Sequence, residues 1–442
     1  MFNFLKPAPD AAVKVAPEKV KSVYKLRQLG VLLSICVGYI GYYVIRLIFT
    51  TEQNDIMHAY GFSTAQIGLI LSCFGIGYGI SKLFMGALSD KSNPKWYLAT
   101  GLFISALLNI GLGSTKNLYV IMFLMLIMSV AQGMGAAACQ RTVQLWWGKK
   151  WRGTVYSIWS SAHNAGAFVC VAVVQLASFA FGSLAAVFYT GSVVAILIAI
   201  FIVLTGADRP STVGLPSVTQ MSGEQQVSES HAELTELSLF QIFIKYILTN
   251  KLVWAITLTS MSLYLVRYGI MSWIPSYLVQ SKGFDPSFAK WLVGVFELAA
   301  VPGVILMGAI SDFLASRRAF VCILCVIGLL LCLTIYFFSA SHTLIITMLF
   351  IIGTLIYAPL TLVGLMVNEA VPKFAVGSST GFMGFFQYIF GETLATALIG
   401  ILVHQYGWIA GNIVLYSSAG LALILLVYIM FKEKNQLKTI NN

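Results

Sequence analysis

The chain has 442 residues, of which 58% are hydrophobic and only 10% are charged. A soluble domain carries about 25% charged residues, so this composition excludes a soluble protein and predicts an all-α membrane protein with many spans. The net charge of +11 comes from 27 Lys and Arg against 16 Asp and Glu. Because the cations gather in loops, we interpret the charge as a signal of topology and predict no nucleic-acid partner.

Twelve apolar runs are long enough to cross a bilayer as helices, which takes about 20 residues each. They cover 28–50, 63–88, 96–114, 117–146, 153–180, 183–205, 252–279, 288–311, 319–339, 343–368, 376–404 and 408–431. The runs predict twelve transmembrane helices in a lipid bilayer.

Residues 1–27 are polar and basic and lack the apolar core of a cleavable signal, so we expect the first run to be retained. Basic residues, among them Arg317 and Arg318, recur on every second loop. By the positive-inside rule this places those loops in the cytoplasm. We therefore predict a multi-pass protein of the bacterial inner membrane, with a cytoplasmic N-terminal segment (1–27) and a cytoplasmic tail (432–442).

The longest polar segment, 206–250, predicts a cytoplasmic linker between two six-helix halves, 28–205 and 251–431. The end of this linker, Leu237–Leu248, is amphipathic. Such a segment lies along the membrane surface or forms a solvated helix, and the sequence leaves both interpretations open.

The two halves resemble each other in sequence. Gly86–Asp90 (GALSD) recurs as Gly308–Asp312 (GAISD), an offset of 308 − 86 = 222. Gly61 and Gly283, each followed by Phe, are also 222 residues apart. This register predicts two pseudo-symmetric halves, the organisation of major facilitator transporters.

Arg46 lies inside the first apolar run, close to Tyr39, Tyr42 and Tyr43. An arginine at the centre of a membrane helix costs about 2.5–3.5 kcal/mol on insertion scales, so it predicts a function. We expect an anion site with the tyrosine hydroxyls as donors. Alternatively, Arg46 pairs with a buried acid, or its side chain extends to the membrane–water interface.

The repeat predicts a counterpart of Arg46 near 46 + 222 = 268, and Arg267 is there, with Tyr264 beside it. Two guanidinium groups facing a central cavity would bind an anion through forked hydrogen bonds. Phosphate carries about −1.5 to −2 charges and therefore balances the charge of two arginines more completely than a single carboxylate does. A dicarboxylate is the alternative ligand.

Two further basic side chains lie in apolar runs. Lys82 adds positive potential to the site or reaches towards the cytoplasm. His163 lies among small residues and forms an interhelical hydrogen bond or contacts the ligand, where it would titrate near neutral pH.

Acidic side chains also occur within the predicted spans. Glu297, Glu369 and Glu392 would pair with the arginines of the empty protein, or one of them would couple a proton. Asp90 and Asp312 lie at predicted helix ends, where we expect a gating salt bridge or a cap.

Motifs along nearly the whole chain resemble the organophosphate:phosphate antiporters of the major facilitator superfamily. They are FLKPAPD (Phe4–Asp10), GYxxYYxxR (Gly38–Arg46), YGISKxxMGxxSDKSNPK (Tyr78–Lys95), QGMG (Gln132–Gly135), AHNxG (Ala162–Gly166), NKLxW (Asn250–Trp254), LVRYGIMSWIPSYL (Leu265–Leu278) and VPKFAVGSSTGFMGFFQYIFG (Val371–Gly391). The last two look closest to the phosphoglycerate transporters.

The resemblance implies that Arg46, Arg267 and His163 bind the phosphate. It also implies exchange of an organic phosphate for inorganic phosphate by alternating access, in a monomer. We see no catalytic motif, metal-ligand spacing or cofactor motif, and we predict no enzyme activity.

Departures from the family pattern bear on the substrate. Leu47 follows Arg46 where glycerol-3-phosphate members have lysine, and Ala395 lies a turn after Glu392 where hexose-phosphate members have a lysine. We favour phosphoglycerate or glycerol-3-phosphate. The rivals are a hexose-6-phosphate antiporter, a transporter-like hexose-phosphate sensor and a proton-coupled carboxylate symporter.

Overall fold

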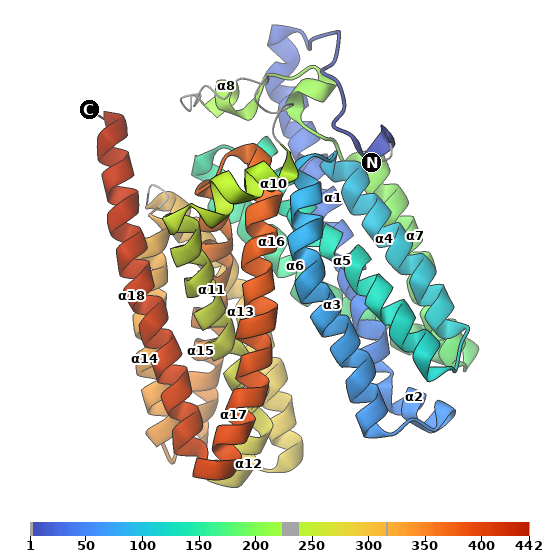
Figure 1. Ribbon diagram of the computed structural model, residues 1–442, viewed down its shortest axis with the longest axis vertical. Helices are drawn as coiled ribbons and strands as arrows, with labels where there is room; N and C mark the ends of the chain where they lie inside the picture. The colour runs from blue at the N-terminus through green and yellow to red at the C-terminus, as the bar shows by residue number, and fades with distance from the viewer. Residues whose placement is uncertain (1–2, 223–237, 315–316, 442) are drawn as a thin grey trace. The chain divides into compact units, whose positions relative to one another are not determined.

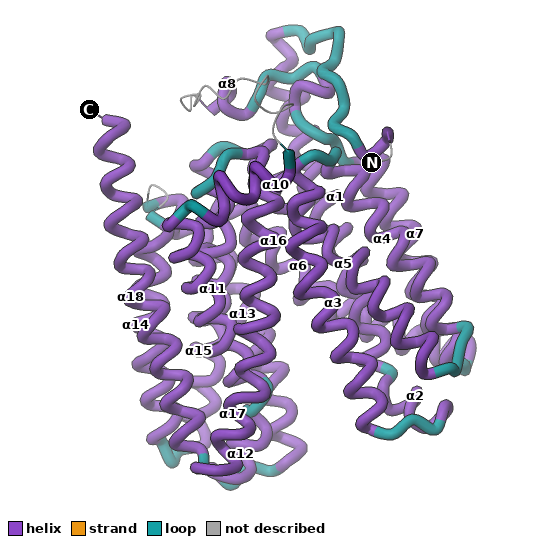
Figure 2. Tube along the Cα trace, viewed as in Figure 1, coloured by secondary structure: helices purple, strands orange, loops and turns teal. Residues whose placement is uncertain are grey.

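The computed structural model describes residues 3–222, 238–314 and 317–441, and within these ranges it contains helices and loops but no strand (Figures 1 and 2). Ten helices are long and apolar enough to span a membrane. They are α1 (Pro17–Thr51), α3 (Thr64–Asp90), α4 (Pro94–Gly113), α5 (Leu118–Trp146), α6 (Lys149–Phe181), α7 (Leu184–Thr205), α13 (Pro286–Phe313), α14 (Arg318–Phe338), α15 (His342–Glu369) and α18 (Trp408–Asn441).

The other two predicted runs are also helical, but each is interrupted. The run 252–279 forms α11 (Lys251–Met271) and α12 (Ile274–Lys282), separated by a turn. The run 376–404 forms α16 (Val376–Phe386), the π-helix η5 (Gln387–Glu392) and α17 (Thr393–Tyr406). The all-helical membrane fold predicted from the twelve runs is therefore confirmed.

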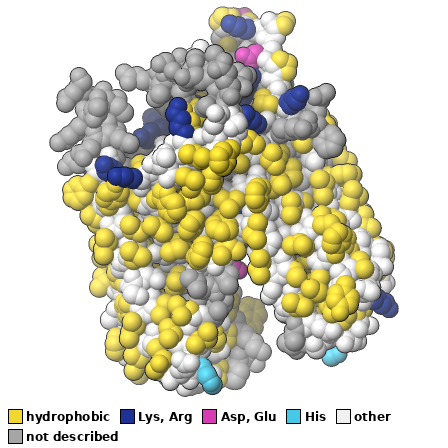
Figure 3. Space-filling model, viewed as in Figure 1, with side chains coloured by type: hydrophobic (Ala, Val, Ile, Leu, Met, Phe, Trp, Pro, Cys, Tyr) yellow, Lys and Arg dark blue, Asp and Glu magenta, His cyan; other side chains and the backbone are white. Residues whose placement is uncertain are grey.

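Short helices connect or precede the spans. They are η1 (Asn3–Leu5), α2 (Gln53–Tyr60), η2 (Pro210–Val213), α8 (Val218–Ser222), α10 (Leu239–Ile242), the π-helix η3 (Phe243–Leu248) and η4 (Lys373–Ala375). Of the predicted linker, residues 223–237 lie outside the described ranges. Figure 3 shows apolar side chains over the middle of the helices on the visible face, as expected for helices that contact lipid.

The chain packs as two compact units. Unit 1 comprises the described parts of Met1–Gly148, Ala162–Phe243 and Pro372–Gly381, and unit 2 those of Lys149–Ser161, Ile244–Val371 and Phe382–Asn442. The first turns of α6 thus pack in unit 2, and the start of α16 packs in unit 1. The predicted halves, 28–205 and 251–431, stay predictions from the repeat.

Helix packing repeats from one unit to the other. In unit 1 the contacts join α3 to α5, α4 to α5, α4 to α7, α1 to α7 and α1 to α5. In unit 2 they join α13 to α15, α14 to α15, α14 to α18, α11 to α18 and α11 to α15. The sequence repeat therefore corresponds to a repeat of three-dimensional packing within each unit.

The 222-residue register has a physical cause at the turns that precede α3 and α13. Gly61 and Gly283 end short helices in the left-handed conformation, with φ of 71° and 68°, which glycine adopts without strain. Two residues later, the side chains of Ser63 and Asp285 accept the N–H groups of Gln66 and Phe288 in the first turns of α3 and α13. The repeated glycine thus stops one helix so that the cap can start the next.

The N-terminal segment is fixed to the chain that follows α7. The Ala8 N–H donates to Asp208 Oδ2 at 2.9 Å, and Arg209 donates to the Ala8 carbonyl and the Asp10 carboxylate, both at 3.1 Å. Burial raises the pKa of the Asp208 carboxyl, and the Ala8 N–H and nearby cations partly offset that rise. The FLKPAPD motif therefore holds the segment before α1 against the start of the linker.

Candidate functional site

Arg46 lies among aromatic rings in unit 1. Its guanidinium carbon is 4.4 Å from the ring centre of Tyr78, 5.4 Å from that of Phe74 and 5.6 Å from that of Tyr43. Phe74 and Tyr78 come from α3 and stack on each other at 5.9 Å. Rings at this distance attract a cation through their negative faces, which stabilises a guanidinium inside an apolar bundle.

Lys82 shares one of these rings with Arg46. Its ammonium nitrogen is 5.0 Å from the ring centre of Tyr78, and the residue is only 8% exposed. Of the two interpretations left open by the sequence, this position favours positive potential beside Arg46 over a side chain that reaches water.

Tyr42 lies apart from this cluster, in the core of unit 1. Its hydroxyl donates to the Leu98 carbonyl at 2.9 Å, and its ring packs against Gly101 and Gly135. The Tyr42 side chain thus packs α1 against α4 and α5, and it is not part of the proposed site.

Tyr39 and His163 each lie next to the ring of Tyr43, which contacts Arg46. The ring centres of Tyr39 and Tyr43 are 5.3 Å apart, and those of Tyr43 and His163 are 5.5 Å apart. Gly166 explains the close approach of α6 to α1, because a Cβ there would lie 2.6 Å from the Cβ of Tyr43. The AHNxG motif thus brings the imidazole to Tyr43, one of the rings that contact Arg46.

Arg267 occupies a similar aromatic setting in unit 2. Its guanidinium carbon is 4.3 Å from the ring centre of Tyr357, 4.8 Å from that of Tyr268 and 5.9 Å from that of Tyr264. It also forms an ion pair with Glu297, with 3.6 Å between Nη2 and Oε1. The Tyr357 hydroxyl donates to the same carboxylate oxygen.

Around both Arg267 and Arg46, a glycine and a further ring pack against the tyrosine that precedes the arginine. A Cβ at Gly391 would lie 2.7 Å from the Cβ of Tyr264, as one at Gly166 would from Tyr43. The ring centre of Tyr388 is 5.8 Å from that of Tyr264, so Tyr388 takes the place that His163 has in unit 1. Glu392, the residue after Gly391, is the last residue of η5.

Asp90 holds the start of α16 within unit 1. Its Oδ1 accepts the Gly377 N–H at 2.6 Å, and its Oδ2 accepts the Ser378 N–H at 2.7 Å and the Ser378 hydroxyl at 2.6 Å. Carboxylates stabilise helix N-termini in this way. Gly86 makes the contact possible, because an added Cβ would clash with the Gly377 carbonyl.

Asp312 does the same for the start of α6 within unit 2. It accepts the N–H groups of Gly153 and Thr154, at 3.0 and 2.6 Å. It also pairs with Arg318 at 3.0 Å. Asp90 thus binds amides at the start of α16, whereas Asp312 binds those of the fifth and sixth residues of α6 and pairs with Arg318.

Arg318 is fully buried, although the sequence placed it in a loop cluster. Its Nε donates to Glu369 Oε2 at 2.7 Å and its Nη2 to Glu369 Oε1 at 3.0 Å. Arg152 is 3.8 Å from the same carboxylate. Glu369, one of the acids predicted inside the spans, thus belongs to this network rather than to the Arg267 cluster.

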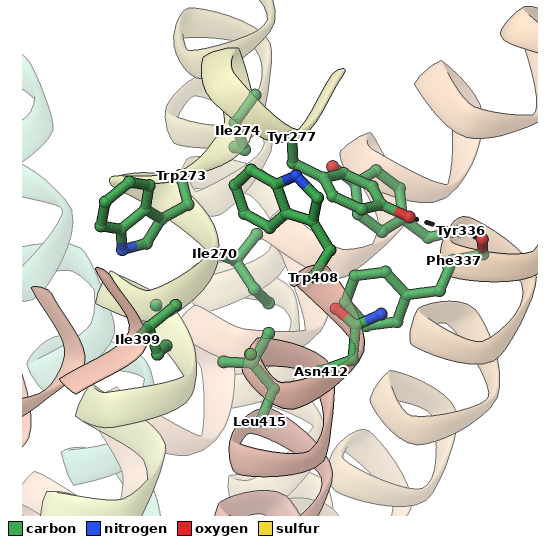
Figure 4. A pocket seen from close by; sticks show the side chains of 12 residues that line it. Ile270, Trp273, Ile274, Tyr277, Tyr336, Phe337, Ile399, Trp408, Asn412 and Leu415 are labelled. Carbon is green, nitrogen blue, oxygen red and sulfur yellow. Dashed lines mark hydrogen bonds between the residues drawn. The ribbon is translucent and has the colours of Figure 1, made fainter. Parts of the chain in front are cut away.

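Unit 2 also has a small, partly open pocket between α11, α12, α14, α17 and α18 (Figure 4). Aromatic side chains line it, and Tyr277 donates to the Phe337 carbonyl at 3.4 Å along its edge. The lining comprises Gly269, Ile270, Trp273, Ile274, Tyr277, Tyr336, Phe337, Ile399, Trp408, Gly411, Asn412 and Leu415. Because this lining has no charged side chain, the pocket does not suit a phosphate.

The sequence profile of the Major Facilitator Superfamily matches residues 31–391 and 283–442. The chain belongs to this superfamily. It is therefore a multi-pass membrane protein of a transporter superfamily, and the fold class predicted from the sequence is confirmed.

Three relatives of this superfamily protein match along most of their length. The glycerol-3-phosphate transporter of Bacillus subtilis is 37% identical over 433 residues, covering 96% of this chain and 97% of the relative. The phosphoglycerate transporter protein of Salmonella typhimurium is 36% identical, covering 93% and 90%. The hexose-6-phosphate:phosphate antiporter of the same organism is 29% identical, covering 89% and 88%. The resemblance to organophosphate transporters is thereby confirmed.

Proposed function

We propose that this protein exchanges an organic phosphate for inorganic phosphate across the bacterial inner membrane. The observation that carries the proposal is the unit 1 cluster, in which Arg46 and Lys82 share the ring of Tyr78 inside the spans. Cations inside a membrane protein mark ligand or ion pathways. The names of the three relatives all include a phosphorylated substrate.

Phosphate fits this cluster by charge and by geometry. A group with about −1.5 to −2 charges is attracted to both cations. The Arg46 guanidinium offers two parallel N–H donors to two phosphate oxygens, and Lys82 adds a point charge. Tyr43, which contacts Arg46, and its neighbours Tyr39 and His163 would supply hydrogen-bonding groups to the ligand.

Arg267 and Glu297 form a half-site that responds to the ligand. In the described structure Glu297 pairs with Arg267 and accepts from Tyr357. An arriving phosphate competes with Glu297 for the guanidinium, and the Tyr357 hydroxyl holds the displaced carboxylate. Arg267 is then paired with an anion in both the empty and the loaded protein, which limits the desolvation cost of binding.

The contacts of Asp90 and Asp312 serve as gates. Asp90 on α3 joins the first predicted half to α16 of the second, and Asp312 on α13 joins the second to α6 of the first. Alternating access needs such contacts to break when the halves rock. We place both gates and both termini on the cytoplasmic side, by the positive-inside rule, in a monomer.

The substrate we favour is phosphoglycerate or glycerol-3-phosphate, because relatives with those names reach 36–37% identity against 29% for the hexose-6-phosphate antiporter. The alternatives are a hexose-6-phosphate antiporter and a transporter-like hexose-phosphate sensor.

The test is exchange of labelled phosphate in proteoliposomes loaded with unlabelled phosphate. Competitors are 3-phosphoglycerate, phosphoenolpyruvate, glycerol-3-phosphate and glucose-6-phosphate. We expect rapid exchange, inhibited best by a three-carbon phosphate. Strong inhibition by glucose-6-phosphate alone would support the hexose branch. Tight binding of one organic phosphate without any exchange would support the sensor.

A further inference from the structure

The chain that leads into α11 forms a ten-residue helix across the end of that span. It comprises α10 (Leu239–Ile242) and the π-helix η3 (Phe243–Leu248), and its axis makes an angle of 78° with α11 (Figure 1). Ser238 starts it with a capping box to Gln241. Since α11 crosses the bilayer, a helix at nearly a right angle to α11 runs close to the membrane plane.

Three apolar side chains of this helix are exposed in a row. Phe240 is 71% exposed, Ile244 is 38% exposed and Leu248 is 40% exposed. Their spacing is four residues, and the wider winding of a π-helix brings residues four apart closer to one line than an α-helix does. The helix therefore presents a continuous apolar stripe.

The other sides of the helix differ in character. Gln241 and Lys245 are exposed and flank the stripe, whereas Ile242 and Ile247 are buried, at 2% and 0% exposure. The helix thus has one face in the protein, one polar face and one apolar face that the described residues leave uncovered.

The surroundings of the stripe indicate what covers it. Trp254, on the first turns of α11, donates from its indole to the Leu248 carbonyl at 2.8 Å. Asn250 donates to the Ala370 carbonyl at 3.2 Å, which fixes the turn to the end of α15. These two bonds hold the end of the helix against the ends of α11 and α15. Lys245 and Lys251 are both exposed and add positive charge next to the stripe, which favours anionic head groups as its neighbours.

We propose that Leu239–Leu248 is an interfacial helix bound to the cytoplasmic leaflet. The stripe of Phe240, Ile244 and Leu248 enters the acyl-chain boundary, and Lys245 contacts anionic phospholipid head groups. This helix anchors the end of the linker to the membrane, independently of the transported substrate.

The test is spin-label accessibility in vesicles of phosphatidylethanolamine and phosphatidylglycerol. Single cysteines replace Phe240, Ile244, Gln241 or Lys245 in the full chain after its seven native cysteines are replaced. Oxygen reports contact with lipid and a water-soluble nickel chelate reports contact with water. We expect labels at 240 and 244 to favour oxygen severalfold over those at 241 and 245, which are matched controls.

Two results would overturn the proposal. Equal access of the nickel chelate to all four labels would mean a solvated linker helix. Labels at 240 and 244 that neither reagent reaches would mean that protein covers the stripe. Substitution Lys245→Glu gives a second measurement, in which the label at 244 should become more accessible to the chelate when phosphatidylglycerol is present.

Discussion

The arginine clusters of the two units have the same arrangement of aromatic rings and glycine around the arginine, but a different charged side chain is added to each. In each, an arginine lies among aromatic rings, a tyrosine stands one turn before it, and a glycine lets a neighbouring helix approach that tyrosine. Unit 1 adds Lys82, whereas unit 2 adds Glu297. The position equivalent to Glu297, at 297 − 222 = 75, is a glycine and offers no carboxylate.

Under the proposed function, this difference gives the two clusters separate tasks. The shared arrangement would hold a guanidinium towards an anion, and the added charge would decide what that guanidinium does before the anion arrives. In the proposed cycle, Arg46 with Lys82 attracts the phosphate, while Arg267 exchanges Glu297 for it.

The largest effect is expected when either guanidinium is replaced. Arg46→Lys and Arg267→Lys should each lower phosphate exchange about a hundredfold or more, because two charge-assisted hydrogen bonds are worth about 1.5–3 kcal/mol each. Exchange in proteoliposomes with equal amounts of protein measures this. Arg27→Lys, at an exposed position on α1, is the matched control. Exchange at the unmodified rate in either variant would refute the two-arginine site.

The second prediction separates the tasks of the clusters. Glu297→Gln removes the competitor for Arg267, so the KM for phosphate should fall about tenfold, equivalent to 1.4 kcal/mol, with a lower maximal rate as release slows. Tyr357→Phe should shift the KM in the opposite direction, because the displaced carboxylate then lacks its donor. Unchanged KM values in both variants would mean that Glu297 does not compete with the ligand.

A smaller effect is expected at Lys82. Lys82→Met keeps the length of the side chain and removes its charge, so the KM for phosphate should rise about tenfold. Lys21→Met, at an exposed position, is the control for loss of one positive charge. If Lys82→Met and Lys21→Met give the same KM, the Lys82 ammonium has no part in binding.

The smallest effect should come from exchanging the ring beside the tyrosine. His163→Tyr gives unit 1 the residue that Tyr388 supplies in unit 2. Because the phenol keeps a ring and a hydrogen-bonding group at this position, the exchange rate should stay within about threefold of the unmodified rate, whereas His163→Phe, which keeps only the ring, should lower it further by the roughly 0.5–1.5 kcal/mol of one hydrogen bond. Equal exchange rates in the two variants would assign His163 to packing alone.

The spans, the repeat and the pair Arg46–Arg267 could be predicted because each leaves a signal along the chain. The length of each apolar run predicts a span, and the 222-residue register predicts where a second arginine should lie. The caps at Gly61 and Gly283 show why that register persists, since both positions need a left-handed residue.

Contacts between helices could not be predicted in the same way. Tyr78 and Tyr357 reach the arginines from other helices, and their approach depends on how each helix is rotated. Arg318 followed the pattern of a loop cation but is buried against Glu369. Tyr42 matched its neighbours in type, yet its face of α1 packs against Leu98.

The most direct measurement is uptake of labelled phosphate into proteoliposomes loaded with unlabelled phosphate, compared with uptake into empty ones. An antiporter built on these two clusters should take up phosphate rapidly only when the vesicles are loaded, and the Arg46→Lys variant should lose about a hundredfold or more of that uptake. Equal uptake into empty vesicles, driven by a pH gradient, would contradict the exchange of one phosphate for another.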